Sequence, residues 1–193
     1  EWADQPTWRA AHARILAAGG QSEEAAVELD ALASRDFADV PLDRGWLGTH
    51  ALAAEVVHAT GATSAAETIE RALAPYAGLS VVLGSTVYYG PVALRLGLLA
   101  HARERMDDAV DELARAISIA RRARAPIWTM HAQLACARAL RDRDEAGDGF
   151  RAATLAREAL ATAERLRLAE RVAEALELEA SLSRGRRSPK RAR

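Results

Sequence analysis

Residues 91–125, PVALRLGLLAHARERMDDAVDELARAISIARRARA, predict two consecutive helices that fold back on each other as a hairpin. Apolar and small residues recur at helical spacing in both halves of this segment. The small residues among them would let two helix backbones approach closely, and the larger ones would fill the remaining space. The predicted contact positions are Gly97, Ala100, Ala109, Leu113 and Ala116.

The same spacing recurs in three other parts of the chain. A small residue is followed by core positions at offsets +3, +12, +16 and +19, with three additional loop residues in the last copy. The other copies are Ala13, Leu16, Ala25, Leu29 and Leu32; Ala53, Val56, Ala65, Ile69 and Ala72; and Ala137, Leu140, Ala152, Ala156 and Ala159. Their period is therefore 40 to 44 residues. Helical hairpins repeated at a fixed period bury their apolar faces by stacking on one another.

This pattern resembles the tetratricopeptide (TPR) repeat, whose usual period of about 34 residues would be lengthened here by longer connections. More narrowly, residues 5–182 resemble the C-terminal helical region of large bacterial ATP-binding regulators. The resemblance rests on Pro75-Tyr76-Ala77-Gly78, Gly90-Pro91, the run 96–100 and Ala159-Leu160. That family includes LuxR-type transcriptional activators and proteins that couple an ATPase to a nucleotide cyclase.

The predicted fold is all-α, a TPR-like superhelix of about four antiparallel hairpins plus a C-terminal capping helix over residues 169–182. Alanine makes up about a quarter of the 193 residues, as expected for a strongly helical chain. We assign residues 1–183 to this domain. Residues 79–89 have strand-like composition, but no other strand is predicted to pair with them, so we expect a buried connection or an irregular helix start. Ser64 and Glu67 predict a capping box.

Residues 184–193, RGRRSPKRAR, form a basic tail. They hold six of the 26 basic residues and no acidic residue, which leaves 20 basic against 27 acidic residues in the remainder. We expect the tail to be a disordered end or an interdomain linker. The alternative is a contact with nucleic acid. Because the sequence starts at Glu1 instead of Met, we also expect it to be a fragment of a longer protein.

No motif in the sequence points to catalysis, a metal or a cofactor. It contains no GxxxxGK[ST] phosphate loop, CxxC pair, HExxH or GxSxG motif, and its only lysine is Lys190. The single cysteine, Cys136, lies among apolar residues and is predicted to be buried. With no apolar run of 18 residues, the chain is expected to be cytoplasmic and not bound to a membrane.

The remaining possibility is recognition at a surface. In a TPR-like stack, the first helix of each hairpin lines the concave side, and four of the five histidines fall at the predicted groove positions. The predicted groove residues are Arg14, His50, His58, His101, His131, Arg138 and Arg141. A half-exposed helix face also tolerates histidine without any binding role. The sharper hypothesis is a weakly basic groove for an acidic peptide, a neighbouring domain or an anionic small molecule.

The functional expectation is therefore a non-enzymatic interaction or regulatory domain of a bacterial cytoplasmic ATP-binding transcriptional regulator. Its partner would be a protein, such as a neighbouring ATPase or effector domain, or alternatively a small-molecule effector. Nucleic acid would be contacted only through the basic tail or a further domain. Two alternatives are the helical regulatory region of a nucleotide cyclase-type signalling enzyme and a free-standing TPR adaptor.

Overall fold

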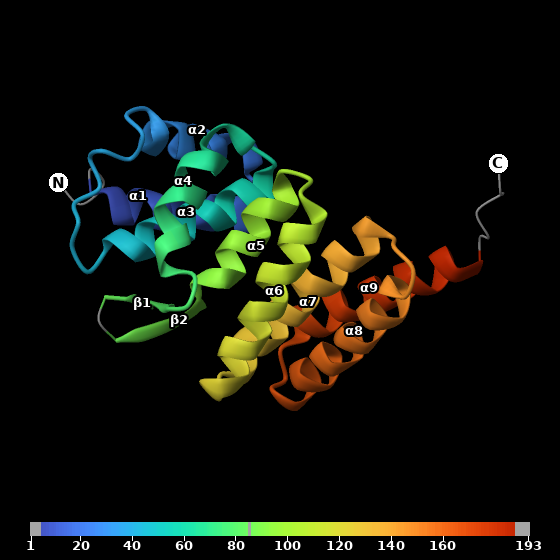
Figure 1. Ribbon diagram of the computed structural model, residues 1–193. Coiled ribbons are helices and arrows are strands. Elements are labelled where there is room, and N and C mark those ends of the chain that lie inside the picture. Colours follow the sequence, from blue (N-terminus) through green and yellow to red (C-terminus); the bar gives the residue numbers. More distant parts are fainter. Residues whose placement is uncertain (1–4, 85, 188–193) are drawn as a thin grey trace, which may run out of the picture. The chain divides into compact units, whose positions relative to one another are not determined.

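A computed structural model describes residues 5–84 and 86–187 of the chain. Within them it has nine α-helices, two short 3-10 helices and one two-stranded sheet (Figure 1), so the protein is mainly helical, as predicted. The chain divides into two compact units, residues 1–105 and residues 106–193. Each unit is described by itself.

The first unit contains five α-helices and the sheet. In chain order its elements are α1 (Pro6–Ala18), α2 (Ser22–Ala33), α3 (Trp46–Thr60), η1 (Thr63–Ala65), α4 (Ala66–Leu73), η2 (Ala74–Tyr76), β1 (Ser80–Leu83), β2 (Val87–Pro91) and α5 (Val92–Ala102). Helix α1 has Pro6 in its first turn and is followed by Gly19 and Gly20. Gly61 ends α3 in the left-handed conformation that glycine adopts readily.

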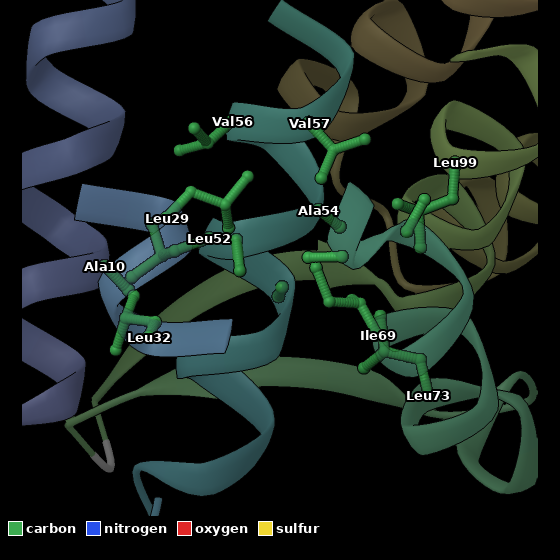
Figure 2. Close-up of a cluster of buried hydrophobic side chains, with 14 of the residues drawn as sticks. Ala10, Leu29, Leu32, Leu52, Ala54, Val56, Val57, Ile69, Leu73 and Leu99 are labelled. Carbon is green, nitrogen blue, oxygen red and sulfur yellow. The ribbon is translucent and has the colours of Figure 1, made fainter. Parts of the chain in front are cut away.

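Helix α3 is the centre of the first unit. It contacts α1, α2, α4, α5 and β1, and its residues 48–54 are all buried. A helix covered on every side can be apolar around its whole circumference, which explains the run WLGTHALAAEVV. Figure 2 shows Leu52 and Val57 of α3 in one cluster with Leu29 of α2, Ile69 of α4 and Leu99 of α5.

The expectation for residues 79–89 was wrong. Strands β1 and β2 pair with each other as an antiparallel hairpin, with Val82 opposite Tyr88 and Leu83 opposite Val87. The partner strand lies in the same apolar segment, after a turn at Gly84, which has a positive φ of 56°. The hairpin packs on α3, where a Cβ at Gly48 would lie 2.5 Å from Cδ2 of Leu83. Glycine at position 48 therefore gives the Leu83 side chain its space.

The predicted capping box at Ser64 does not form. Helix α4 begins at Ala66 after the 3-10 turn η1, and no side chain caps its first turn. The Ser64 hydroxyl instead donates a hydrogen bond to Oδ1 of Asp30 on α2 over 3.3 Å. Because the 3-10 turn places Ser64 before the start of α4, its hydroxyl group links η1 to α2 instead of capping α4.

The second unit consists of four helices, α6 (Met106–Arg122), α7 (Pro126–Arg143), α8 (Asp148–Arg165) and α9 (Ala169–Arg187). Each packs on the next, and α7 also contacts α9. Helix α9 extends five residues beyond the predicted end at Leu182, so the first four residues of the predicted tail are helical. The rest of that tail, residues 188–193, lies outside the described residues.

The recurring positions found in the sequence are core positions. All of them are buried except Leu16 and Ala72, which are partly exposed. Helices α1 and α2, α3 and α4, and α7 and α8 pack as the predicted hairpins. Helix α5 belongs to the first unit and α6 to the second, so the pairing of those two helices stays a prediction.

Candidate functional site

The seven predicted groove residues are divided between the two units. Arg14, His50, His58 and His101 lie in the first unit, and His131, Arg138 and Arg141 lie in the second. The surroundings of each residue decide whether it is available to a partner.

His58 and His101 lie next to each other. They come from the last turns of α3 and α5, and their ring centroids are 5.5 Å apart with a tilt of 35° between the ring planes. Both side chains are partly exposed. The structure thus brings two of the predicted histidines together at the ends of two packed helices, where a partner could reach them.

His50 does not lie on an open surface, contrary to its predicted place on the groove wall. Only 2% of the residue is exposed, and its ring lies 4.2 Å from that of Trp46 and 5.0 Å from that of Phe37. Its Nδ1 hydrogen is donated to the carbonyl oxygen of Trp46 over 2.8 Å. Burial lowers the pKa of the His50 imidazole, and the hydrogen bond to Trp46 opposes this only in part. Because residues 48–54 of α3 are all buried, the His50 side chain is part of the core.

Arg14 belongs to a network centred on Glu55, which sequence reasoning missed. Oε2 of Glu55 accepts a hydrogen bond from Nε of Arg14 over 2.7 Å and one from the Tyr89 hydroxyl over 3.0 Å. Its Oε1 accepts from Nη2 of Arg95 over 2.5 Å. Arg95 is fully buried, and its guanidinium carbon lies 4.6 Å from the centre of the Tyr89 ring. Glu55 on α3 therefore connects α1, α5 and β2.

The charges of this network determine its chemistry. Burial raises the pKa of Glu55, but the guanidinium groups of Arg95 and Arg14 outweigh it and hold that pKa below its ordinary value. Burial, together with the Glu55 charge, raises the pKa of Tyr89 to about 12. A carboxylate paired with two arginines is a poor proton acceptor at neutral pH. The arrangement fits a structural link between helices.

The three predicted residues of the second unit lie along α7. His131 is partly exposed, and its ring centroid is 5.4 Å from that of Trp128. Arg138 donates a hydrogen bond to Oε1 of Glu174 on α9, so it links two helices. Arg141 is exposed and pairs with the adjacent Asp142 over 2.8 Å. All three present side-chain surface to solvent, and Arg138 in addition links α7 to α9.

A second buried carboxylate joins α7 and α8. Asp148 has a side chain only 3% exposed and accepts hydrogen bonds from Nε and Nη2 of Arg143 over 2.8 and 2.9 Å. These bonds hold the pKa of Asp148 below its ordinary value, although burial opposes the effect. Cys136 is buried, as predicted, and burial raises the pKa of its thiol to about 11. A thiol with so high a pKa is a weak nucleophile at neutral pH.

No protein-family model, curated protein or solved structure matches this chain. Among the described residues, no group of three or more histidine, cysteine, aspartate or glutamate side chains is arranged to hold a metal ion. The helices described over residues 5–187 include none with the length and apolar character needed to cross a lipid bilayer.

Proposed function

We propose that this protein is a TPR-like interaction domain of a bacterial ATP-binding transcriptional regulator, and that it has no catalytic activity of its own. The observation that carries this proposal is the burial of the recurring positions at helix contacts. Successive helical hairpins with one shared contact pattern are typical of solenoids, which present extended surfaces for partner recognition. The resemblance of residues 5–182 to such regulators supplies the cellular context.

The partner surface on the first unit would include the pair His58 and His101. Their partly exposed rings come from α3 and α5, the first helices of two successive predicted hairpins. Neighbouring imidazoles can donate hydrogen bonds to carboxylates. An acidic segment of a neighbouring ATPase or effector domain is therefore the partner class that this surface fits. A small-molecule effector and a nucleic acid bound through the basic tail or a further domain are secondary possibilities.

The coding sequence on either side of this chain tests which kind of protein contains this domain. A phosphate loop in a preceding ATPase domain, with a helix-turn-helix module at the end of the protein, is the result expected for a regulator. A cyclase domain would replace this proposal with the alternative of a signalling enzyme. Stop codons immediately on both sides would replace it with a free-standing adaptor in the cytoplasm.

Binding to the flanking ATPase domain tests the interaction directly. Isothermal titration calorimetry with separately expressed ATPase domain should show binding to the 193-residue chain, and a His58→Ala, His101→Ala double variant should weaken it about tenfold, equivalent to about 1.4 kcal/mol. A His12→Ala variant is the matched control, because His12 is an exposed imidazole of α1 in the same unit. Equal binding by the double variant and the control would remove the histidine pair from the partner surface.

A further inference from the structure

A cavity in the second unit is lined by three arginines from two helix ends and the turn between α6 and α7. Its volume is about 320 Å³. Arg121 lies at the end of α6, Arg124 lies in the turn, and Arg165 is the last residue of α8. The other lining residues are Ala125, Pro126, Thr129 and Thr162, so no described lining residue is acidic.

The charges around this cavity are not balanced. Arg121 donates a hydrogen bond to Oε2 of Glu158 over 2.7 Å. Neither Arg124 nor Arg165 pairs with a carboxylate within residues 5–84 and 86–187. Three arginines thus line one cavity, and within the described residues only one of them pairs with a carboxylate. All three are solvent-exposed, so an anion from solution can reach them.

A similar cavity in the first unit provides the contrast. It has a volume of about 340 Å³ and is lined by two glutamates and two arginines together with Ala74. Its charges satisfy one another, because Arg103 pairs with Glu70 over 2.7 Å and Arg71 with Glu67 over 3.5 Å. In this cavity, unlike the one in the second unit, each arginine forms an ion pair with a glutamate that also lines the cavity.

The backbone of the lining residues contributes little to anion binding. Pro126, the first residue of α7, has no amide hydrogen, and the Thr129 amide donates to Ala125 O over 2.9 Å. The amides of Arg124 and Ala125 donate to Arg121 O and Ala120 O, each over 3.0 Å. The attraction for an anion therefore comes from the side chains that line the cavity.

We propose that this cavity binds the phosphate or pyrophosphate group of a small molecule. Planar guanidinium groups can form paired hydrogen bonds with phosphate oxygens, and the Thr162 hydroxyl on the cavity wall can donate another. None of the lining residues is among the seven predicted groove residues. The site is therefore independent of the proposed partner surface, and either can fail without the other.

Arg124 offers a variant that removes a guanidinium without damaging the fold. Its φ is 51°, a left-handed conformation that glycine adopts at lower cost than arginine. Arg167 has the same conformation, with a φ of 56°, at the end of α8, and it does not line the cavity. Arg124→Gly and Arg167→Gly therefore remove the same charge from the same kind of helix end, so they form a matched pair.

Titration of the full chain with inorganic pyrophosphate, at constant ionic strength, tests the proposal. Calorimetry should give a dissociation constant below about 1 mM. The amide signals of Ala125 and Thr129, which line the cavity, should shift in heteronuclear NMR spectra. Arg124→Gly and Arg165→Ala should each weaken binding at least about fivefold, as expected for loss of a charge-assisted hydrogen bond, while Arg167→Gly changes it less than about twofold.

Two results would overturn the site. One is no heat and no shift of those amides up to about 10 mM pyrophosphate. The other is equal weakening by Arg124→Gly and Arg167→Gly, which would indicate a diffuse response to net charge. Thermal unfolding of each variant shows that it is folded, and Arg124→Gly keeps the test valid even if Arg165→Ala unfolds.

Discussion

Arg95 on α5 is fully buried and donates a hydrogen bond from Nη2 to Oε1 of Glu55 on α3 over 2.5 Å. The two residues are 40 positions apart in the chain, which is the shortest spacing of the repeat. Arg14 on α1, 41 positions before Glu55, donates to the other carboxylate oxygen. A single carboxylate thus links α1, α3 and α5.

Replacing Glu55 by alanine should destabilise the first unit strongly. The variant would leave the buried Arg95 and the half-buried Arg14 without their shared carboxylate. Removing one member of a buried ion pair costs about 3 to 5 kcal/mol, because the remaining charge stays desolvated. Urea unfolding followed by circular dichroism measures this change in the free energy of unfolding.

Glu67→Ala is the control for that prediction. The Glu67 side chain is 69% exposed and pairs with Arg71 and Arg103 at the surface. Exposed pairs contribute at most about 1 kcal/mol, so this variant should remain close to wild type. Equal losses in the two variants would show that the Glu55 network is no more important than a surface pair.

The buried helix-contact positions were predictable because small residues at such contacts leave a periodic pattern in the sequence. Close approach of two backbones requires Ala or Gly at the same place in each hairpin, and Ala13, Ala53 and Ala137 are all fully buried. The β-hairpin was missed because both of its strands lie in one apolar segment. No strand outside residues 79–91 is needed, because β1 and β2 within this segment pair with each other.

The site was predicted less completely than the fold. Helical spacing placed His58, His101 and His50 together among the groove candidates. The rings of His58 and His101 do lie side by side, but spacing could not show that His50 is enclosed by Phe37 and Trp46. The Glu55 network was not predicted because apolar periodicity gives no weight to single charged residues. The sequence does contain a pattern that points to it: Glu55 and Arg95 are opposite charges within two apolar helices, 40 positions apart.

The buried imidazole of His50 should make stability depend on pH below about 6.5. Its pKa is lowered in the folded protein, so in this range the unfolded chain binds a proton that the folded chain does not. The free energy of unfolding should therefore fall as pH decreases from about 6.5 toward the folded-state pKa. The contribution of one group is at most about 1.4 kcal/mol per pH unit.

His50→Phe should make this decline less steep, because the ring is kept while the titrating group is removed. Unfolding free energies measured between about pH 7.5 and about pH 5 would show the change in slope. His12→Gln, which removes an exposed imidazole 3.5 Å from Glu28, should not make the decline less steep. An unchanged slope in His50→Phe would contradict the assignment to His50.

A large side chain at Ala109 should disturb the second unit. Ala109 lies on α6, is fully buried and occupies one of the recurring contact positions. Ala109→Phe would force neighbouring side chains from their preferred rotamers, at a cost of about 1 to 3 kcal/mol. Arg115→Ala on the same helix, whose side chain is 52% exposed, should change stability by less than about 0.5 kcal/mol. Urea unfolding of both variants measures the difference, and an Ala109→Phe variant as stable as wild type would mean that this helix contact is loosely packed.

Two of the three described carboxylates that pair with Arg143, Asp148 and Asp107, should differ sharply in their contribution to stability. Asp148 is 3% exposed, accepts two hydrogen bonds from Arg143 and another from the backbone amide of Glu145, whereas Asp107 is 80% exposed and accepts one bond over 2.9 Å. Asp148→Ala would remove two of the hydrogen bonds of the mostly buried Arg143 side chain and the acceptor of a backbone amide, so it should cost about 3 kcal/mol. Asp107→Ala removes only a solvent-screened contact and should cost less than about 1 kcal/mol. Thermal and urea unfolding of both variants decide the matter, and similar losses in the two would show that burial of the Asp148 ion pair gives it no special importance.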